Sequence, residues 1–231
     1  MGPSILPLQI NDGDLGCWVS FDSYRQLSIR SIEFKFVPVT TTNMRTISKQ
    51  YSDPLDLVWI YAAEQIGMQV IRDPEVFASW DGQGVLRIGA PETLDPDDSL
   101  AQMIFHEICH ALVEGPEAFQ QEDWGLDPDV TVGAVHEHAC LRLQSALSDR
   151  YGLREFFAAT TDFREYFDRI GPAPLEGSGD PAIELAEVAY RRAIEGPWSA
   201  ALAAALQQTR SIAEIVSELA PDDSLWRIVK R

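Results

Sequence analysis

Two histidines stand four residues apart in the stretch FHEICHALVEG (105–115), and a glutamate directly follows the first of them. In an α-helix, residues four positions apart lie one turn above each other on the same face, so His106 and His110 can direct both imidazoles at one point. Two converging imidazoles can hold a zinc ion. Glu107 lies one step around the helix, where it can take a proton from a water molecule on the metal. This is the division of labour in H-E-x-x-H metallohydrolases.

A catalytic zinc ion usually has three protein ligands and one open position, so a further ligand is expected from another element. The remaining two histidines lie in the stretch AVHEHACLRLQ. In a helix with this sequence, Glu137 lies on a face of small and polar residues, which makes it the first choice. His136 borders the apolar face and is the alternative third ligand. His138 shares its side with charged residues and is expected to face water.

Other polar residues are lesser candidates for the site. Asp123 and Asp127 lie between the two histidine stretches, where either of them is a possible ligand or a partner that orients a ligand histidine. Three tyrosines, Tyr151, Tyr166 and Tyr190, are candidates for stabilising an oxyanion, with packing in the core as the alternative role for each.

Local signals predict the helices that carry these residues. The first histidine pair falls in a predicted helix over 95–116, with Asp95 as its cap, Pro96 at the first helical position and Gly115-Pro116 at its end. A second helix is predicted from about Val130 to Tyr151. The first helix also has an apolar stripe that should hold it in the core: Leu100, Ile104, Ile108 and Leu112.

The segments before the first histidine helix predict a small sheet. Residues 1–50 alternate apolar with polar residues and look β-rich. A helix over 53–67 follows, and then the short strands MQVIRD, VFASW and GVLRIGAP, with a hairpin turn at Asp81-Gly82. If GVLRIGAP is an edge strand, it can pair with an extended peptide through backbone hydrogen bonds; the alternative is a plain strand within the sheet.

These elements predict an α+β fold in which a small mixed sheet packs on the helix with the HExxH motif, followed by a mainly helical C-terminal part. We expect a core over 1–170, whose first 50 residues form a β-rich part. A loop over 171–181 is expected to connect this core to helices within 182–231 that pack on it.

The net charge of the chain indicates which classes of binding partner are not expected. Lys plus Arg total 18 and Asp plus Glu total 36, giving 18 − 36 = −18. A chain with this negative net charge repels phosphate backbones and anionic lipids. Neither a nucleic acid nor a membrane is therefore expected as a partner. No secretory signal is visible, and three cysteines without CxxC spacing favour a reducing compartment, so a cytoplasmic location is expected.

The arrangement resembles a known family. HEICH on a helix, preceded by a helix and a hairpin that ends in GVLRIGAP, looks like the zincin metallopeptidases, and a later helix that offers Glu137 is similar to their gluzincin branch. The resemblance implies that His106, His110 and Glu137 bind zinc and that Glu107 is the general base. The chain departs from the metzincins, because Val113 replaces their glycine and no third histidine follows at the short spacing.

A narrower similarity links residues 106–125 to elongation factor P hydroxylase. That family has HExxH, then a glycine, then Asp-aromatic-Gly, which are here the HEICH motif, Gly115 and Asp123-Trp124-Gly125. This similarity implies non-haem iron in place of zinc, because two histidines and Glu137 also make a 2-His-1-carboxylate set.

We therefore expect a metal-dependent hydrolase, a zinc metallopeptidase that acts on a peptide or protein substrate and uses Glu107 as its base. One alternative is an iron-dependent hydroxylase with the same ligands. The other is a metal-binding protein without catalytic activity.

Overall fold

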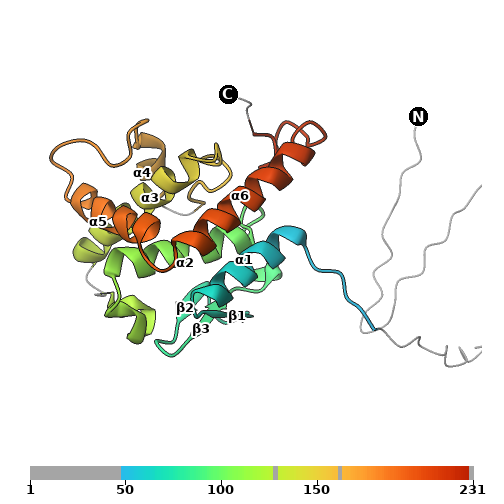
Figure 1. The fold of residues 1–231 in the computed structure, drawn as a ribbon, viewed down its shortest axis with the longest axis horizontal. Coiled ribbons are helices and arrows are strands. Elements are labelled where there is room, and N and C mark those ends of the chain that lie inside the picture. The colour runs from blue at the N-terminus through green and yellow to red at the C-terminus, as the bar shows by residue number, and fades with distance from the viewer. Residues whose placement is uncertain (1–47, 127–129, 161–162, 229–231) are drawn as a thin grey trace, which may run out of the picture. The chain divides into compact units, whose positions relative to one another are not determined.

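Six α-helices and one three-stranded sheet make up the part of the chain described by the computed structural model, which covers residues 48–126, 130–160 and 163–228 (Figure 1). The α+β class expected from the sequence is confirmed. The β-rich stretch predicted over 1–50 lies outside the described residues, apart from its last three positions. None of the described helices is long and apolar enough to cross a membrane.

Helix α1, Pro54–Gln65, begins and ends where local signals place it. The Asp53 carboxylate accepts a hydrogen bond from the Leu55 backbone N–H at 2.8 Å, and Pro54 occupies the first helical position. After the helix, Gly67 adopts a φ of +88°, a conformation open to glycine at little cost. The helix buries Leu55, Trp59, Ala62 and Ala63 in the core.

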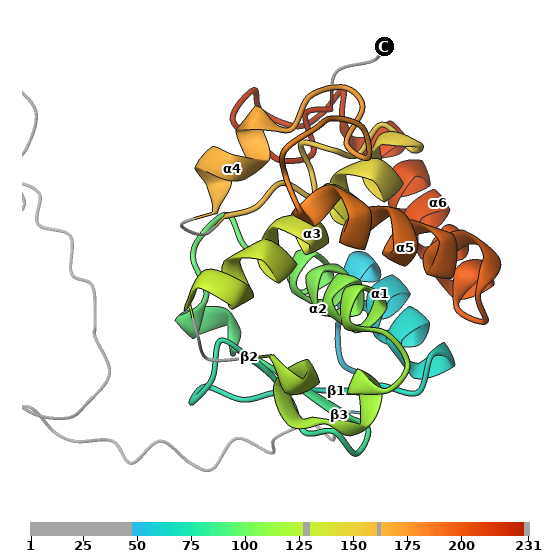
Figure 2. The same ribbon diagram turned by 90° about the vertical axis from the view of Figure 1, so that its left-hand side faces the viewer.

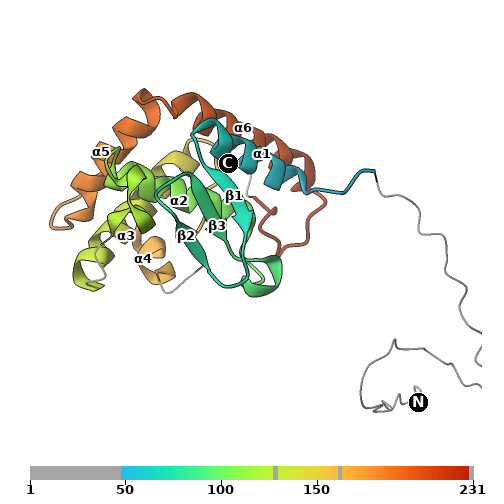
Figure 3. The same cartoon turned by 90° about the horizontal axis from the view of Figure 1, so that it is seen from below.

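The sheet contains β1 (Gln69–Arg72), β2 (Ala78–Trp80) and β3 (Val85–Ile88) in the order β1-β3-β2 (Figure 3). β3 is parallel to β1 and antiparallel to β2, so the sheet is mixed. Because β3 lies between two partners, GVLRIGAP is the plain sheet strand of the alternative interpretation and not an edge strand. Its hydrogen-bonding groups are already used by β1 and β2, which leaves β3 no free edge for a peptide.

The predicted hairpin joins β2 to β3. The Asp81 carboxylate accepts hydrogen bonds from the backbone N–H groups of Gln83 at 2.7 Å and Val85 at 2.9 Å, which closes the turn. Gly82 has a φ of +68°, and a Cβ added there would lie 2.9 Å from the backbone carbon of Gln121 and 3.0 Å from the backbone nitrogen of Glu122. The tip of the hairpin therefore packs directly on the backbone of the segment that follows the histidine helix.

Helix α2, Leu100–Glu114, carries the HEICH motif and starts later than expected. Its cap is Ser99, whose hydroxyl accepts a hydrogen bond from the Gln102 N–H at 3.2 Å. The predicted cap, Asp95, is wrong because Asp95 and Asp98 bond to each other in a separate turn before the helix. The predicted end is confirmed: the helix stops at Gly115, which has a φ of +91°.

Almost every side of α2 is buried, and not the predicted stripe alone. Helices α1, α3 and α5 and strand β3 all pack against it (Figure 2). At its carboxyl end, the Arg192 guanidinium of α5 donates hydrogen bonds to the carbonyls of Leu112 at 2.7 Å and Val113 at 2.9 Å. These carbonyls lie in the last turn of α2, where helix geometry leaves them without a partner in the helix.

Four more helices complete the described fold: α3 (Val130–Asp149), α4 (Arg164–Arg169), α5 (Ala182–Glu195) and α6 (Ser199–Val216). The buried face of α5 consists largely of alanines, which allows close packing on α2 and α3. Helix α6 lies along α1, where the Trp59 indole donates to the Thr209 hydroxyl at 3.0 Å (Figure 1). Residues 171–181 connect α4 to α5, in the place of the predicted loop. The predicted division of the chain into a core and a C-terminal part stays a prediction.

Replacing Gly82 by alanine should destabilise the fold by about 1–3 kcal/mol, because the new methyl group meets backbone atoms and the left-handed conformation is strained for alanine. Chemical denaturation measures the change in the free energy of unfolding. Gly171→Ala is the matched control, since a Cβ there meets no atom within 4 Å and should change stability by less than about 0.5 kcal/mol. Equal stability of the two variants would contradict the close packing of the hairpin tip.

Candidate metal centre

Three predicted ligands, His106, His110 and Glu137, lie together at the contact between α2 and α3. The Nε2 atoms of His106 and His110 are 3.0 Å apart. One Glu137 oxygen lies 3.3 Å from the His106 Nε2, and the other lies 3.2 Å from the His110 Nε2. One donor atom from each residue thus converges on a common point. Helix α2 supplies two of these donors from successive turns, and α3 supplies the third.

The spacing of the donors fits a metal ion. Bonds of about 2.0–2.1 Å in a tetrahedral arrangement place neighbouring donor atoms roughly 3.3–3.4 Å apart. The two Nε2 atoms, 3.0 Å apart, come close to this spacing, and the two Glu137 oxygens lie at 3.3 and 3.2 Å from one Nε2 each. The group can therefore hold a metal ion, and its two imidazoles and one carboxylate are a donor set found with both zinc and non-haem iron.

Glu137 and His136 differ clearly in where their side chains lie. Glu137 faces both ligand histidines, whereas the His136 Nδ1 lies 2.6 Å from a carboxylate oxygen of Glu114 in the last turn of α2. His136 is outside the group of converging donors. The geometry favours the first choice from the sequence over the alternative.

His138, which the sequence pattern predicts to face water, is partly exposed and packs one face of its ring on a neighbouring side chain. Its ring stacks on Tyr166 with the ring centroids 3.6 Å apart and the planes 2° from parallel. The Tyr166 hydroxyl donates to Asp180 at 2.7 Å and accepts from Arg142 at 2.6 Å, while burial and the bond to Asp180 raise the pKa of Tyr166 to about 12. This hydroxyl is therefore committed to a structural network that ties α3 to the loop before α5.

The other lesser candidates also have structural surroundings. The Asp123 carboxylate accepts a hydrogen bond from the Trp80 backbone N–H at 3.1 Å, so it supports the edge of the sheet. Asp127 lies outside the described residues. Tyr151 and Tyr190 are partly buried and pack against the hydrophobic core, which agrees with the packing alternative for both.

Outer hydrogen bonds orient the two histidines. The Gln144 amide nitrogen donates to the Phe157 carbonyl, which turns the amide oxygen towards the His106 Nδ1 at 3.1 Å. The His106 Nδ1 then carries a proton, which leaves Nε2 as the nitrogen that can offer a lone pair to a metal ion. The Cys140 sulfur lies 3.2 Å from the His110 Nδ1 on the other histidine.

The orienting role of Gln144 is absent from the sequence prediction, although a signal for it exists. Cys140 and Gln144 follow Glu137 by three and seven positions, so the three residues share one face of a helix. Helix α3 places that face against α2. Choosing Glu137 as a ligand therefore also selects these two residues as neighbours of the ligand histidines.

Electrostatics favour a positive charge within the donor group. Burial lowers the pKa of His106, but the Glu137 carboxylate, helped by Glu107 and by the hydrogen bond to Gln144, outweighs burial and raises the pKa of His106 to about 9. Burial also opposes the charge on Glu137, yet the two imidazoles hold the pKa of this carboxyl well below its usual range. A positive charge between carboxylate and imidazoles is thus stabilised, and a metal cation supplies such a charge.

Glu107, the predicted base, lies beside the donor group without belonging to it. Only 7% of its surface is exposed, and its Oε2 accepts a hydrogen bond from the Trp124 indole at 2.9 Å. The sequence prediction did not identify Trp124 as a partner of Glu107. Trp124 belongs to the short η3 segment (Glu122–Gly125), in which Asp123 and Trp124 have φ values of +45° and +61°.

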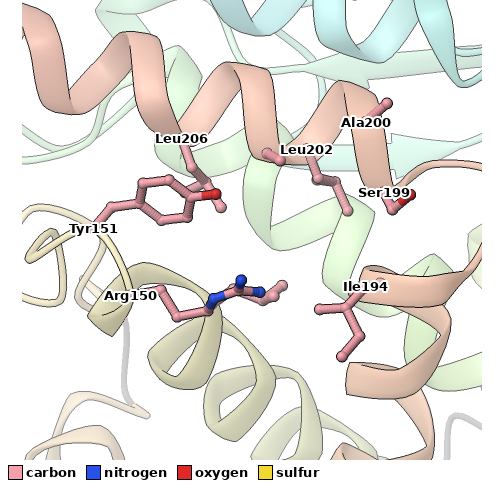
Figure 4. Close-up of a pocket in the computed structure, with 10 residues that line it drawn as sticks. Arg150, Tyr151, Ile194, Ser199, Ala200, Leu202 and Leu206 are labelled. Carbon is pink, nitrogen blue, oxygen red and sulfur yellow. The ribbon is translucent and has the colours of Figure 1, made fainter.

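Several pockets among the described residues lie away from the donor group. A cavity of about 270 Å³ lies between α6, α5 and the end of α3 (Figure 4). Its lining is mostly aliphatic, with Arg150, Tyr151 and Ser199 as polar members. Leu147 in this lining is ten residues beyond Glu137, or roughly 15 Å along the helix axis. The cavity lacks converging acid and base groups, so the candidate functional site is the histidine and carboxylate cluster.

In comparisons with protein-family models, with curated proteins and with solved structures, nothing matches this chain.

The His110→Ala and Glu137→Ala variants should each lose bound metal, because each removes one of three converging donors. His136→Ala should keep the metal, since this side chain pairs with Glu114 instead. Elemental analysis of the purified proteins gives the metal content per chain and also identifies the metal. Loss of metal in His136→Ala together with its retention in Glu137→Ala would reverse the assignment of the third ligand.

Replacing Gln144 by alanine should weaken metal binding by about 10-fold to 100-fold while leaving all three ligands in place, because His106 loses the partner that fixes its ring. Competition with a chromogenic chelator measures this affinity. Ser148→Ala is a suitable control on the same helix, since the Ser148 hydroxyl bonds to carbonyls of its own helix. An unchanged affinity in the Gln144 variant would argue against the orienting role.

Proposed function

We propose that the chain is a metal-dependent hydrolase, and more specifically a zinc metallopeptidase of the zincin type. The observation that carries the proposal is a buried carboxylate, Glu107, next to three converging donors but outside them. A purely structural metal site needs its ligands and no base. A hydrolytic site needs the ligands together with a base that can reach water.

Zinc bound by the three donors would supply a Lewis acid that acidifies water and polarises a carbonyl group. Glu107 then accepts the proton of the attacking water on a carboxylate oxygen and later delivers it to the leaving nitrogen. His106 and Glu137 keep 23% and 17% of their side-chain surface exposed, whereas the His110 side chain keeps 7%. A substrate would therefore approach from the side of His106 and Glu137, with the base deeper in the site.

The proposal of a peptide substrate and of a zincin-like core is supported by the order and packing of the elements. A helix, a mixed sheet, the HExxH helix and a helix with a carboxylate ligand follow one another, and α2 packs against α1, β3 and α3. The central position of β3 removes the proposed pairing of a peptide with that strand. A substrate would be held instead by groups around the opening at His106 and Glu137.

Iron-dependent hydroxylation remains the second candidate, because the same donors form a 2-His-1-carboxylate set. The two functions differ in what they ask of Glu107. Hydrolysis requires a carboxylate base beside the ligands, whereas the hydroxylase similarity assigns no role to it. Iron in the purified protein, together with consumption of oxygen, would favour the hydroxylase.

The Glu107→Gln variant should retain its metal and lose turnover of fluorogenic peptides by about 100-fold to 10,000-fold, because the amide cannot accept the proton from water. Peptide cleavage by the zinc-loaded protein, beside its metal content, provides the measurement. Glu114→Gln removes a carboxylate from the same helix that pairs with His136, and it should keep turnover within a small factor. Hydrolysis by Glu107→Gln at the wild-type rate would refute the proposed base.

A further inference from the structure

We propose that Trp124 is a positioning residue for the base: its indole N–H holds Oε2 of Glu107 so that Oε1 is the oxygen that exchanges the proton. This inference rests on the proposed function and assigns each carboxylate oxygen a role. The hydrogen bond of 2.9 Å joins two buried side chains, with Trp124 3% exposed and Glu107 7% exposed.

The chemistry of the indole suits this role. An indole nitrogen donates a hydrogen bond and cannot accept one, so Trp124 does not compete with Glu107 for the proton taken from water. A hydrogen bond to a charged acceptor is also stronger and shorter than a neutral one. The hydrogen bond therefore fixes Oε2 of Glu107. It also opposes rotation of the carboxylate that would turn both oxygens away from the metal site.

The backbone that delivers Trp124 is unusual. Asp123 and Trp124 have φ values in the left-handed region, which residues with bulky side chains rarely adopt. Gly125 follows with a φ of +68°, and a Cβ there would lie 2.3 Å from the Gln121 side chain. Strained residues persist where surrounding contacts over-determine them, and such places are often functional sites. Here the strained turn directs an indole at the predicted base.

The sheet supplies those surrounding contacts. Trp80, the last residue of β2, stacks on Trp124 with the ring centroids 4.7 Å apart and the planes 4° from parallel. The Trp80 backbone N–H donates a hydrogen bond to the Asp123 carboxylate. The Trp80 indole donates to the Phe119 carbonyl at 3.0 Å. Gly82 at the hairpin tip meets the backbone of the same segment. The β2–β3 hairpin thus supports the turn from which Trp124 reaches Glu107.

The alternative is that Trp124 only fills the core, and its neighbour Trp80 allows the two roles to be separated. Both indoles belong to one stack, and both N–H groups have a partner. The Trp80 N–H reaches a backbone carbonyl, whereas the Trp124 N–H reaches Glu107. Trp124→Phe and Trp80→Phe therefore remove similar aromatic area and one N–H each, but only the first removes a contact with the base.

The test compares these two variants with the wild type in the full-length, zinc-loaded protein. Trp124→Phe should retain metal and lower kcat for a fluorogenic peptide by roughly 10-fold to 100-fold, with KM changed by less than about twofold, because the base is misplaced while the substrate contacts remain. Trp80→Phe should lower kcat by less than about threefold. Equal kcat values for the two variants, at equal metal content, would overturn the positioning role.

A second readout needs no turnover. In protein with ¹⁵N-labelled tryptophan, the indole resonance that disappears in Trp124→Phe belongs to Trp124, and it should shift in Glu107→Gln, whereas the Trp80 resonance should stay in place. An unchanged chemical shift of the Trp124 indole in Glu107→Gln would overturn the inference, even if the protein cleaves peptides. Absence of cleavage by the wild type would refute the proposed function separately.

Discussion

A carboxylate held between two imidazoles is the contact on which the arrangement of α2 and α3 depends. Glu137 is mostly buried, and a buried carboxylate without compensation costs several kcal/mol. His106 and His110 supply that compensation, and because they come from successive turns of α2, they fix the register of α3 along it. The pairs His110–Cys140 and His106–Gln144 run in opposite directions along the two helices, so these helices are antiparallel. The contacts that bring the three donor atoms together therefore also set the register of α3 along α2.

The surroundings of α2 explain how one helix can carry so many polar groups in a buried position. Its apolar side contacts α1, the sheet and the alanine face of α5, which keeps the helix in place without the help of the histidines. Three polar side chains of the HEICH motif each have a partner: Gln144 for His106, Cys140 for His110 and Trp124 for Glu107. The buried Gln102 amide in the first turn of α2 has no hydrogen-bond partner among the described residues. The candidate metal site is therefore a hydrogen-bonded network set into a hydrophobic core.

The features that could be predicted from the sequence are those that depend on local periodicity. The spacing of His106 and His110 places both rings on one face of any helix, and the choice of Glu137 over His136 followed from the faces of the second helix. The central position of β3 and the stacking of His138 on Tyr166 depend on contacts between distant segments, which periodicity does not contain. The hydrogen bond between Trp124 and Glu107 requires a left-handed tryptophan, which local propensity disfavours. The predicted cap of α2 is also wrong, because the backbone of Asp95 bonds to Asp98 in a separate turn and Ser99 caps the helix instead.

The bond from Arg192 to the end of α2 gives the C-terminal helices a larger part in the site than their distance in sequence suggests. Its guanidinium closes the last helical turn at Leu112 and Val113, directly after the turn that bears His110. Gly115 leaves room for this side chain, since a Cβ there would lie 2.9 Å from the guanidinium. If α5 detached, the turn below His110 would fray and two carbonyls would need water. Detachment of α5 should therefore also release any cation that the three donors hold, so that both occur in one cooperative step.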